Sequence, residues 1–476
     1  MAYNFIECNR DQDYLLPPSL REWLPEKDLA WFVLDAVGEL ELDAFYSGYR
    51  EDGTGQAAYD PGMMVALTLY AYCVGERSSR RIERFCERDI GFRVIAANAR
   101  PDHSTVSRFR RKHHEALSGL FTKILALCAK AGVVKVGTVA LDGTKEKANA
   151  SLAANRTHET IQTEVERMLA EAEAVDAAED ELYGPDKRGD ELPEELQNRQ
   201  SRLARLKEAK AVLEAERAAE EAAHAERMAK REAEEEASGK RKRGRKPKAP
   251  EAEDEAKANI TDPESRIMKT RTGYVQGYNG QAAVTEGQII IAAEVTQEAN
   301  DVRQLHPMLT SAKEELKAAG VEEEIGAVTA DAGYWSEQNM VAADPEGPEL
   351  FIATTKDWKQ RKALREQGSP RGRMSKEMTA RDRMERKLLT KRGREIYRKR
   401  GMTVEPVFGQ AKSVRDCDHF LVRGTRMVRM EWRLICGTHN LLKLWRSGKA
   451  KFKEWCQETM SASIVQGKQM IPCGCG

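Results

Sequence analysis

Two aspartates each stand directly after a short apolar run, where a charge is unfavourable unless it is paired or binds a metal. Asp331 follows the run Ile325–Ala330, and Asp142 follows Val133–Leu141. Runs of this length, bounded by turn residues, predict buried strands. Ligands of open α/β sheets bind at the ends of such strands. We therefore predict that both aspartates are metal ligands.

A third acid, Glu405, lies in a predicted helix over residues 402–412. The apolar residues of this helix share one face: Val404, Val407, Phe408 and Ala411. Three such carboxylates could hold two divalent cations about 3.5–4 Å apart, which clamp the attacking and leaving oxygens of a phosphodiester. Mg²⁺ favours carboxylate ligands. We predict that Asp142, Asp331 and Glu405 bind Mg²⁺, with Mn²⁺ as a substitute.

The charges are strongly segregated along the chain, although 77 basic and 77 acidic residues cancel over its 476 residues. The run 356–400 holds far more Lys and Arg than acids, and Arg381–Arg400 is predicted to be a helix with a basic face. A basic surface beside a carboxylate cluster suits an enzyme that acts on a polyphosphate, because cationic side chains position the phosphates.

Several bulk features point to a cytoplasmic protein with no membrane segment. No uncharged apolar run approaches the roughly 18 residues of a membrane span. Residues 1–14 lack the basic and apolar regions of a signal peptide. The nine scattered cysteines suit a reducing compartment better than a disulfide framework.

Residues 1–130 are predicted to form an all-helical domain. Apolar residues recur at helical spacing in Leu20–Leu40 and Pro61–Val74. A later helix, Thr105–Ala116, can be capped by Asp102 or Ser104.

The capped helix has one apolar and one basic face. Val106 and Phe109 would face the core, and the outward set is Ser107, Arg108, Arg110, Arg111 and Lys112. A short helix followed by a basic one suits a helix-turn-helix whose second helix enters the DNA major groove. A solvated basic helix of an ordinary bundle explains the pattern equally well. Ser107, Arg108 and Arg111 are the DNA-binding candidates.

The middle of the chain interrupts the predicted core. Residues 131–151 carry the first strand and then Lys145 and Lys147, which would lie beside a phosphate backbone or in a plain exposed turn. Residues 152–258 are rich in Ala, Glu, Lys and Arg and predict a helical hairpin broken at 184–193. A coiled-coil seam begins there but fades into alanines. The basic run 240–248 would contact DNA or serve as a linker.

Residues 259–453 complete the predicted core, and 454–476 form a tail. After the first strand we predict a hairpin, a helix, the strand ending in Asp331, a short helix, a last strand and basic C-terminal helices, at residues 272–284, 287–296, 302–319, 325–330, 336–343, 350–353 and 381–445. Three strands in a meander followed by βα alternation predict an RNase H-like α/β fold, a mixed sheet flanked by helices. The helical insertion would lie between its first and second strands.

Taken together, the motifs resemble bacterial insertion-sequence transposases of the DDE, RNase H-like type, over about residues 15–150 and 260–447. The resemblance rests on YDPGMMVALTLYAYCVGERSSRRIERFC, PDHSTVSRFR, LDGTKEKANAS, TGYVQGYNGQAAV, TADAGYWSE, RGMTVEPVFGQAK and GTHNLLKLW. It implies that Asp142, Asp331 and Glu405 are the catalytic acids. If one acid is misassigned, Asp301 or Glu395 is the first substitute to test.

The resemblance also implies roles for four further residues. A tyrosine–arginine–glutamate–lysine signature maps onto Tyr397, Arg400, Glu405 and Lys412, with one residue more between the arginine and the glutamate than the usual pattern. Tyr397, Arg400 and Lys412 would contact DNA. Trp335 would stack on a displaced base, or pack in the core as the alternative.

The implied activity is cleavage of DNA at the ends of an insertion sequence and strand transfer into target DNA by a two-metal mechanism. The implied partners are double-stranded DNA, as terminal inverted repeats and target, and a second copy of the chain, because two element ends must be paired. The bacterial nucleoid is the expected location. Alternatives are a metal-dependent nuclease without strand transfer, a transposase-derived DNA-binding protein, and an interaction protein built on the helices of 157–237.

Overall fold

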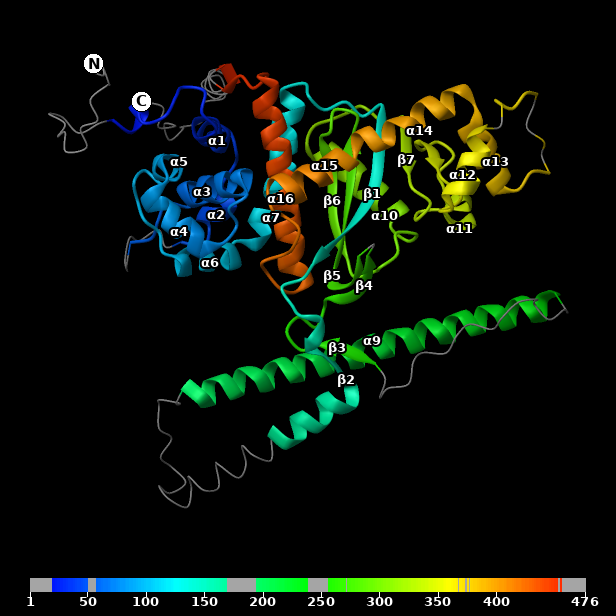
Figure 1. The fold of residues 1–476 in the computed structure, drawn as a ribbon, viewed down its shortest axis with the longest axis horizontal. Coiled ribbons are helices and arrows are strands. Elements are labelled where there is room, and N and C mark those ends of the chain that lie inside the picture. The colour runs from blue at the N-terminus through cyan, green and yellow to red at the C-terminus, as the bar shows by residue number, and fades with distance from the viewer. Residues whose placement is uncertain are drawn as a thin grey trace, which may run out of the picture.

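The computed structural model describes residues 19–49, 57–168, 194–238, 256–270, 272–366, 368–372, 375, 377–452 and 454–455. Figure 1 shows three parts: helices of the N-terminal region, a sheet with its own helices, and a long helix set apart from both. Two helices, α7 and α16, stand between the first two parts. None of the described helices is both long and apolar enough to cross a membrane.

The N-terminal region is helical, as predicted. A 3₁₀ turn, Leu20–Glu22, precedes α1 (Leu29–Gly38), α2 (Asp43–Tyr46), α3 (Pro61–Val74), α4 (Ser79–Arg88), α5 (Ile90–Ile95), α6 (His103–Lys112) and α7 (His114–Lys130). Local signals set the bounds of α3, since Asp60 accepts a hydrogen bond from the Met63 N–H and Pro61 occupies the first helical position. Gly75 ends the helix at φ +85°, a conformation that glycine adopts without strain.

The sheet is mixed. Its strands are β1 (Thr138–Lys147), β4 (Arg266–Thr270), β5 (Gly273–Thr285), β6 (Ile290–Thr296), β7 (Ala327–Ala330) and β8 (Glu349–Ile352). The order is β4-β5-β1-β7-β8, and β6 also pairs with β5. β5 is antiparallel to β1, β4 and β6, whereas β1, β7 and β8 run parallel. The predicted neighbours, the strands before Asp142 and Asp331, are therefore paired directly.

β1 differs from its predicted bounds. It begins at Thr138 rather than Val133 and continues past Asp142 to Lys147. The reason is its antiparallel partner, because β5 offers backbone groups to every residue of β1 from Val139 to Lys147. The predicted exposed turn after Asp142 is thus a strand.

The helices of this region cover both faces of the sheet. They are α10 (Leu305–Ala318), α11 (Glu337–Val341), α12 (Trp358–Glu366), α13 (Ala380–Leu389), α14 (Lys391–Thr403), α15 (Glu405–Gly409) and α16 (Thr425–Ser447). One hydrophobic cluster joins the N-terminal helices to α16 and one face of the sheet. A second cluster packs α10 against the other face. The apolar core is therefore continuous beyond residue 130.

Two predicted helices are divided. The helix predicted over Arg381–Arg400 breaks at Thr390, whose hydroxyl accepts a hydrogen bond from Gly393 N and caps α14. A side chain at Gly393 would collide with the Lys387 carbonyl, so this tight turn needs glycine. The helix predicted over 402–412 is split into the end of α14, α15 and a π-helical turn, Gln410–Val414. Pro406 has no N–H for the preceding turn, which favours a new helix start at Glu405.

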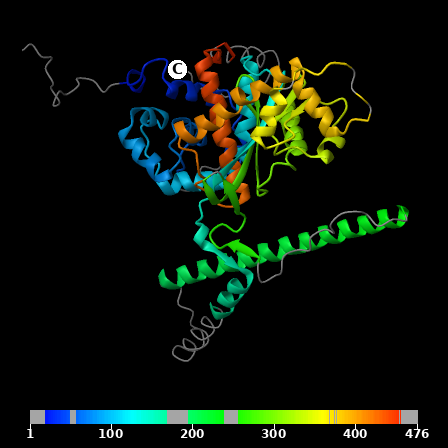
Figure 2. The same ribbon diagram turned by 45° about the vertical axis from the view of Figure 1, so that its right-hand side comes forward.

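The insertion projects from the sheet region (Figures 1 and 2). Its base is a short antiparallel pair, β2 (Asn155–Thr157) with β3 (Lys257–Asn259). Beyond this pair lie a helix over residues 158–168 and α9 (Glu194–Ser238). They share a small apolar cluster: Ile161, Val165, Leu206, Ala209, Leu213 and Ala258. The predicted break at 184–193 and the basic run 240–248 lie outside the described residues.

Candidate active site

The structure brings Asp142 and Asp331 to adjacent positions on neighbouring strands. The parallel register pairs Leu141 with Ala330, and the two aspartates follow directly. Beyond this pair β7 ends, while β1 continues along β5. Asp331 Oδ1 accepts a hydrogen bond of 2.6 Å from Gly333 N, and Asp142 Oδ1 accepts one of 3.0 Å from Gly143 N. Both carboxylates are therefore held at the point where the parallel part of the sheet opens.

Arg400, near the end of α14, lies between Asp142 and the third acid. Its Nη2 atom is 2.7 Å from Asp142 Oδ2, and its Nη1 atom is 3.9 Å from Glu405 Oε1. The side chains of Arg400 and Asp142 are 15% and 18% exposed, whereas that of Glu405 is 68% exposed. The guanidinium thus bridges a half-buried acid and a largely exposed one.

The electrostatics of the site favour a bound cation. Burial, with smaller contributions from Asp331 and Asp301, raises the pKa of Asp142 to about 6, and Arg400 opposes the rise. Burial acts to lower the pKa of Arg400, but the combined attraction of Asp142, Tyr397, Asp331 and Glu405 outweighs it, so that the pKa is raised. Asp331 and Glu405 act on Arg400 in the same sense as Asp142. All three predicted acids therefore surround one guanidinium.

The donor chemistry of this site fits a hard divalent cation. Carboxylate oxygens are the ligands that Mg²⁺ prefers, and Arg400 occupies the position of a cation between Asp142 and Glu405. Within the part of the chain that the structure describes, no three His, Cys, Asp or Glu side chains are already arranged around a single metal position. The three carboxylates suit a divalent cation by their ligand type and by their common neighbour Arg400, while Glu405 lies apart from the two aspartates.

Two family models match this chain. Residues 18–112 match a transposase domain (DUF772), and residues 356–445 match a transposase DDE domain. The chain is a DDE-type transposase. Comparisons with curated proteins and with solved structures found no match.

The two matches cover different parts of the transposase. The first spans α1 to α6, and the second spans α12 to most of α16 and includes Arg400, Glu405 and Lys412. Asp142 and Asp331 lie outside both matched ranges, so their assignment rests on the sheet geometry above.

Two of the lysines predicted to contact DNA, Lys412 and Lys147, are paired with acids. Lys412 Nζ lies 2.9 Å from Glu146 Oε1 and donates to the Lys145 carbonyl at 3.1 Å. The Glu146 side chain is only 2% exposed, and burial raises its pKa to about 7 although Lys412 opposes this rise. Lys147 is exposed and lies 2.9 Å from Asp418. Lys412 thus neutralises a buried carboxylate in this structure, and the side chain of Lys145, the residue before Glu146 on β1, is half-exposed.

Tyr397 contributes to a basic cavity beside Glu405. The cavity has a volume of about 570 Å³ and lies between the segment after β8 and the helices α13 and α14. Its charged lining comprises Glu385, Arg394, Arg398, Arg400 and Glu405. A strand of DNA bound near Glu405 would contact the arginine side chains of this cavity. Trp335 is half-buried against the second hydrophobic cluster, which is the alternative that the sequence left open.

On α6, most of the predicted faces are confirmed. Asp102 caps the helix by accepting a hydrogen bond of 2.8 Å from Thr105 N, and Val106 and Phe109 are buried. Arg108, Arg111 and Lys112 are exposed, and Ser107 is half-buried.

Arg110, predicted to point outward, is buried. It donates a hydrogen bond of 2.7 Å to the Arg77 carbonyl. It lies four residues after Val106 and therefore on the same, inward face of α6. Arg110 is thus a packing residue, which leaves Arg108 and Arg111 as the arginines that α6 presents to solvent.

The predictions from the sequence do not include three buried polar residues near the two aspartates. Asn279, Gln281 and Tyr334 are buried and linked by hydrogen bonds to each other or to Asp301. Polar side chains inside an otherwise apolar strand were the available signal, because a buried amide needs partners. Asp301, named only as a substitute acid, lies among them, whereas Glu395 is exposed on α14.

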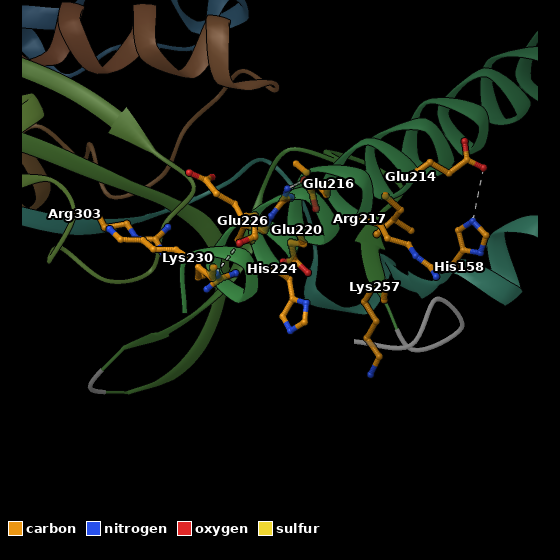
Figure 3. A pocket seen from close by; sticks show the side chains of 16 residues that line it. His158, Glu214, Glu216, Arg217, Glu220, His224, Glu226, Lys230, Lys257 and Arg303 are labelled. Atoms are coloured by element: carbon orange, nitrogen blue, oxygen red, sulfur yellow. Dashed lines mark hydrogen bonds and ion pairs between the residues drawn. The ribbon is translucent and has the colours of Figure 1, made fainter. Parts of the chain in front are cut away.

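Another cavity, of about 1000 Å³, lies away from the three predicted acids (Figure 3). It is lined mainly by α9, with His158, Lys257, Arg266 and Arg303 from neighbouring segments. Its acids and bases are mixed, and His158 Nε2 lies 4.0 Å from Glu214 Oε1. None of the three predicted acids lines it. We therefore place the chemistry at the sheet.

Proposed function

We propose that this transposase cleaves DNA at the ends of its element and joins the freed ends to target DNA in one active site formed by Asp142, Asp331 and Glu405. The observation that carries the proposal is the parallel pairing of β1 with β7, which sets two carboxylates side by side next to a basic cavity. The strand order supports an RNase H-like core, with an antiparallel β1-β5-β6 meander extended by parallel β7 and β8.

The three acids would hold Mg²⁺ or Mn²⁺. When bound, such ions supply an activated water and stabilise the leaving 3′ oxygen of a phosphodiester. The residues of the chain position the DNA. Arg394, Arg398 and Arg400 line the cavity next to Glu405 and hold phosphates there by charge. Arg400 also keeps Asp142 ionised, since it opposes the rise in the pKa of that carboxyl.

The other parts of the chain serve DNA binding and assembly in this proposal. Residues 1–130 recognise the terminal repeats through α6, where Arg108 and Arg111 are exposed. Residues 131–151 and 259–453 form the catalytic core, and 152–258 form an inserted module. Two copies of the chain pair two element ends.

A strand-transfer assay tests the function. The substrate is a precut end with a free 3′-hydroxyl, taken from inverted repeats that flank the gene, together with plasmid target and Mg²⁺. Joined product is expected, and Asp331→Asn abolishes it while binding to the end persists. Glu324→Gln is the matched control, because Glu324 is an exposed acid in the segment that leads into β7. Cleavage of uncut ends without any joining would instead identify a nuclease.

A further inference from the structure

Asp301, between β6 and α10, is held by two buried amides. Its Oδ1 atom accepts hydrogen bonds of 2.8 Å from Asn279 Nδ2 and 2.7 Å from Gln281 Nε2. Both amides lie on β5, and their residues are 1% and 0% exposed. Gln281 is fixed in turn, because its Oε1 atom accepts a hydrogen bond from the Tyr334 hydroxyl. The Asp301 carboxylate is therefore anchored through one oxygen.

The anchored carboxylate lies next to Gly143 and Gly333, which follow Asp142 and Asp331 in the chain. A Cβ atom placed on Gly143, the residue after Asp142, would lie 2.5 Å from Asp301 Oδ1. A Cβ atom placed on Gly333 would lie 3.1 Å from Asp301 Oδ2 and 2.8 Å from Asp331 Oδ1. Only glycine at these two positions leaves room for the carboxylates to approach one another.

A buried acceptor is directed at the same place. Asn279 Oδ1 has no hydrogen-bond partner among the described residues, and it would lie 2.9 Å from a Cβ on Gly143. The orientation of this amide is set, because its Nδ2 donates both to Asp301 and to the Glu298 carbonyl at 3.1 Å. A buried acceptor left without a donor is unfavourable. A cation, or a water molecule bound to one, would satisfy it.

Helix capping does not explain Asp301. α10 begins at Leu305 with Gln304 at its N-cap, and no side chain caps it. The two amides bond Oδ1 of Asp301, and Oδ2 lies on the side of Gly333.

We propose that Asp301 is a fourth carboxylate of the active site, which binds the divalent cation together with Asp142 and Asp331 and is held in place by Asn279 and Gln281. This inference rests on the function proposed above. The proposed role of Asp301 accounts for the exposed position of Glu405. Asp142, Asp331 and Asp301 form the inner ligand group, and Glu405 completes the coordination from α15.

Calorimetric titration of the full-length protein with Mn²⁺ tests this proposal. Asp301→Asn should weaken Mn²⁺ binding at least about tenfold, as Asp331→Asn does, while the exposed control Glu324→Gln binds like the wild type. Wild-type affinity in Asp301→Asn, with binding lost in Asp331→Asn, would overturn the role of Asp301 and leave the proposed function standing. Wild-type affinity in both variants would contradict both.

A second measurement needs no variant and stays decisive if Asp301→Asn fails to fold. Fe²⁺ bound in place of Mg²⁺ reduces added hydrogen peroxide to hydroxide and a hydroxyl radical and is itself oxidised to Fe³⁺, which added ascorbate reduces again. The radical cuts the backbone next to the ligands of the iron. Cuts near residues 142, 331 and 301 are expected in the wild-type protein, and excess Mg²⁺ should suppress all three. Cuts near 142 and 331 without one near 301 would refute the inference.

Discussion

The N-terminal helices and the catalytic region are joined by a buried ion pair whose removal should be costly. Arg77, between α3 and α4, has its Nη1 atom 2.9 Å from Glu431 Oε1 on α16, and the two side chains are 2% and 0% exposed. Arg77 also donates to the carbonyls of His419 and Asp416, each at 2.8 Å. Glu431 Oε2 accepts a hydrogen bond of 2.8 Å from Leu421 N. This ion pair therefore connects the N-terminal helices with α16 and with the loop that follows Lys412.

Arg77→Met should lower the free energy of unfolding by about 3–5 kcal/mol, because Glu431 would keep a buried charge without its counterion. The carbonyls of His419 and Asp416 would also lose donors, which places the effect in the upper part of that range. Adding Glu431→Gln should recover part of the loss, since no uncompensated charge remains and the amide oxygen still accepts from the backbone.

Urea denaturation followed by far-UV circular dichroism and tryptophan fluorescence measures these effects, provided that both probes report one transition. Arg100→Met is the matched control. Arg100 lies 3.5 Å from Glu87 with side chains 62% and 49% exposed, and such a surface pair contributes about 0–1 kcal/mol. A loss below about 1 kcal/mol in Arg77→Met, or separate melting of the N-terminal helices in the wild type, would refute this reasoning.

Three further predictions concern other parts of the chain. Arg108→Ala and Arg111→Ala should each weaken binding to the terminal repeats by about 1–3 kcal/mol with the fold intact, and unchanged affinity in a gel-shift titration at fixed salt would exclude DNA recognition by α6. Replacing residues 158–256 with a short Gly/Ser linker should leave a cooperatively melting protein, because that segment has its own small apolar cluster; aggregation or loss of cooperativity would contradict this. Burial raises the pKa of Glu146 from 4.5 to about 7, so the folded state holds a proton that the unfolded state releases and the free energy of unfolding falls as pH rises from 4.5 through 7. Between pH 5 and 8, the free energy of unfolding of Glu146→Gln should fall by roughly 2–3 kcal/mol less than that of the wild type, as measured by denaturant titrations at each pH. An equal fall in the two proteins would refute the raised pKa.

The positions of the two aspartates could be predicted because the evidence for them is local. An apolar run that stops at a charge indicates a buried strand followed by a site, and both runs lead to adjacent strands. The extent of β1 could not be predicted in this way. Residues 143–147 are polar and resemble a turn, yet they form a strand because β5 pairs with each of them.

The partners of the basic side chains depend on contacts between residues far apart in sequence. Arg400 bonds Asp142 across 258 positions, and Lys412 bonds the Lys145 carbonyl across 267. No local pattern distinguishes a lysine that binds DNA from one that neutralises a buried acid such as Glu146. The same holds for Asp301, whose amide partners lie on β5.

Single-turnover cleavage of an uncut element end in Mg²⁺ tests the assignment of the active site most directly. With Asp331→Asn, cleavage should fall on the order of 10³-fold or more while gel-shift affinity for the end is retained, and Glu324→Gln should cleave like the wild type. Asp142→Asn should behave as Asp331→Asn does, because the two carboxylates serve one site. Near-normal cleavage by either aspartate variant would contradict the assignment of catalysis to this pair of strands.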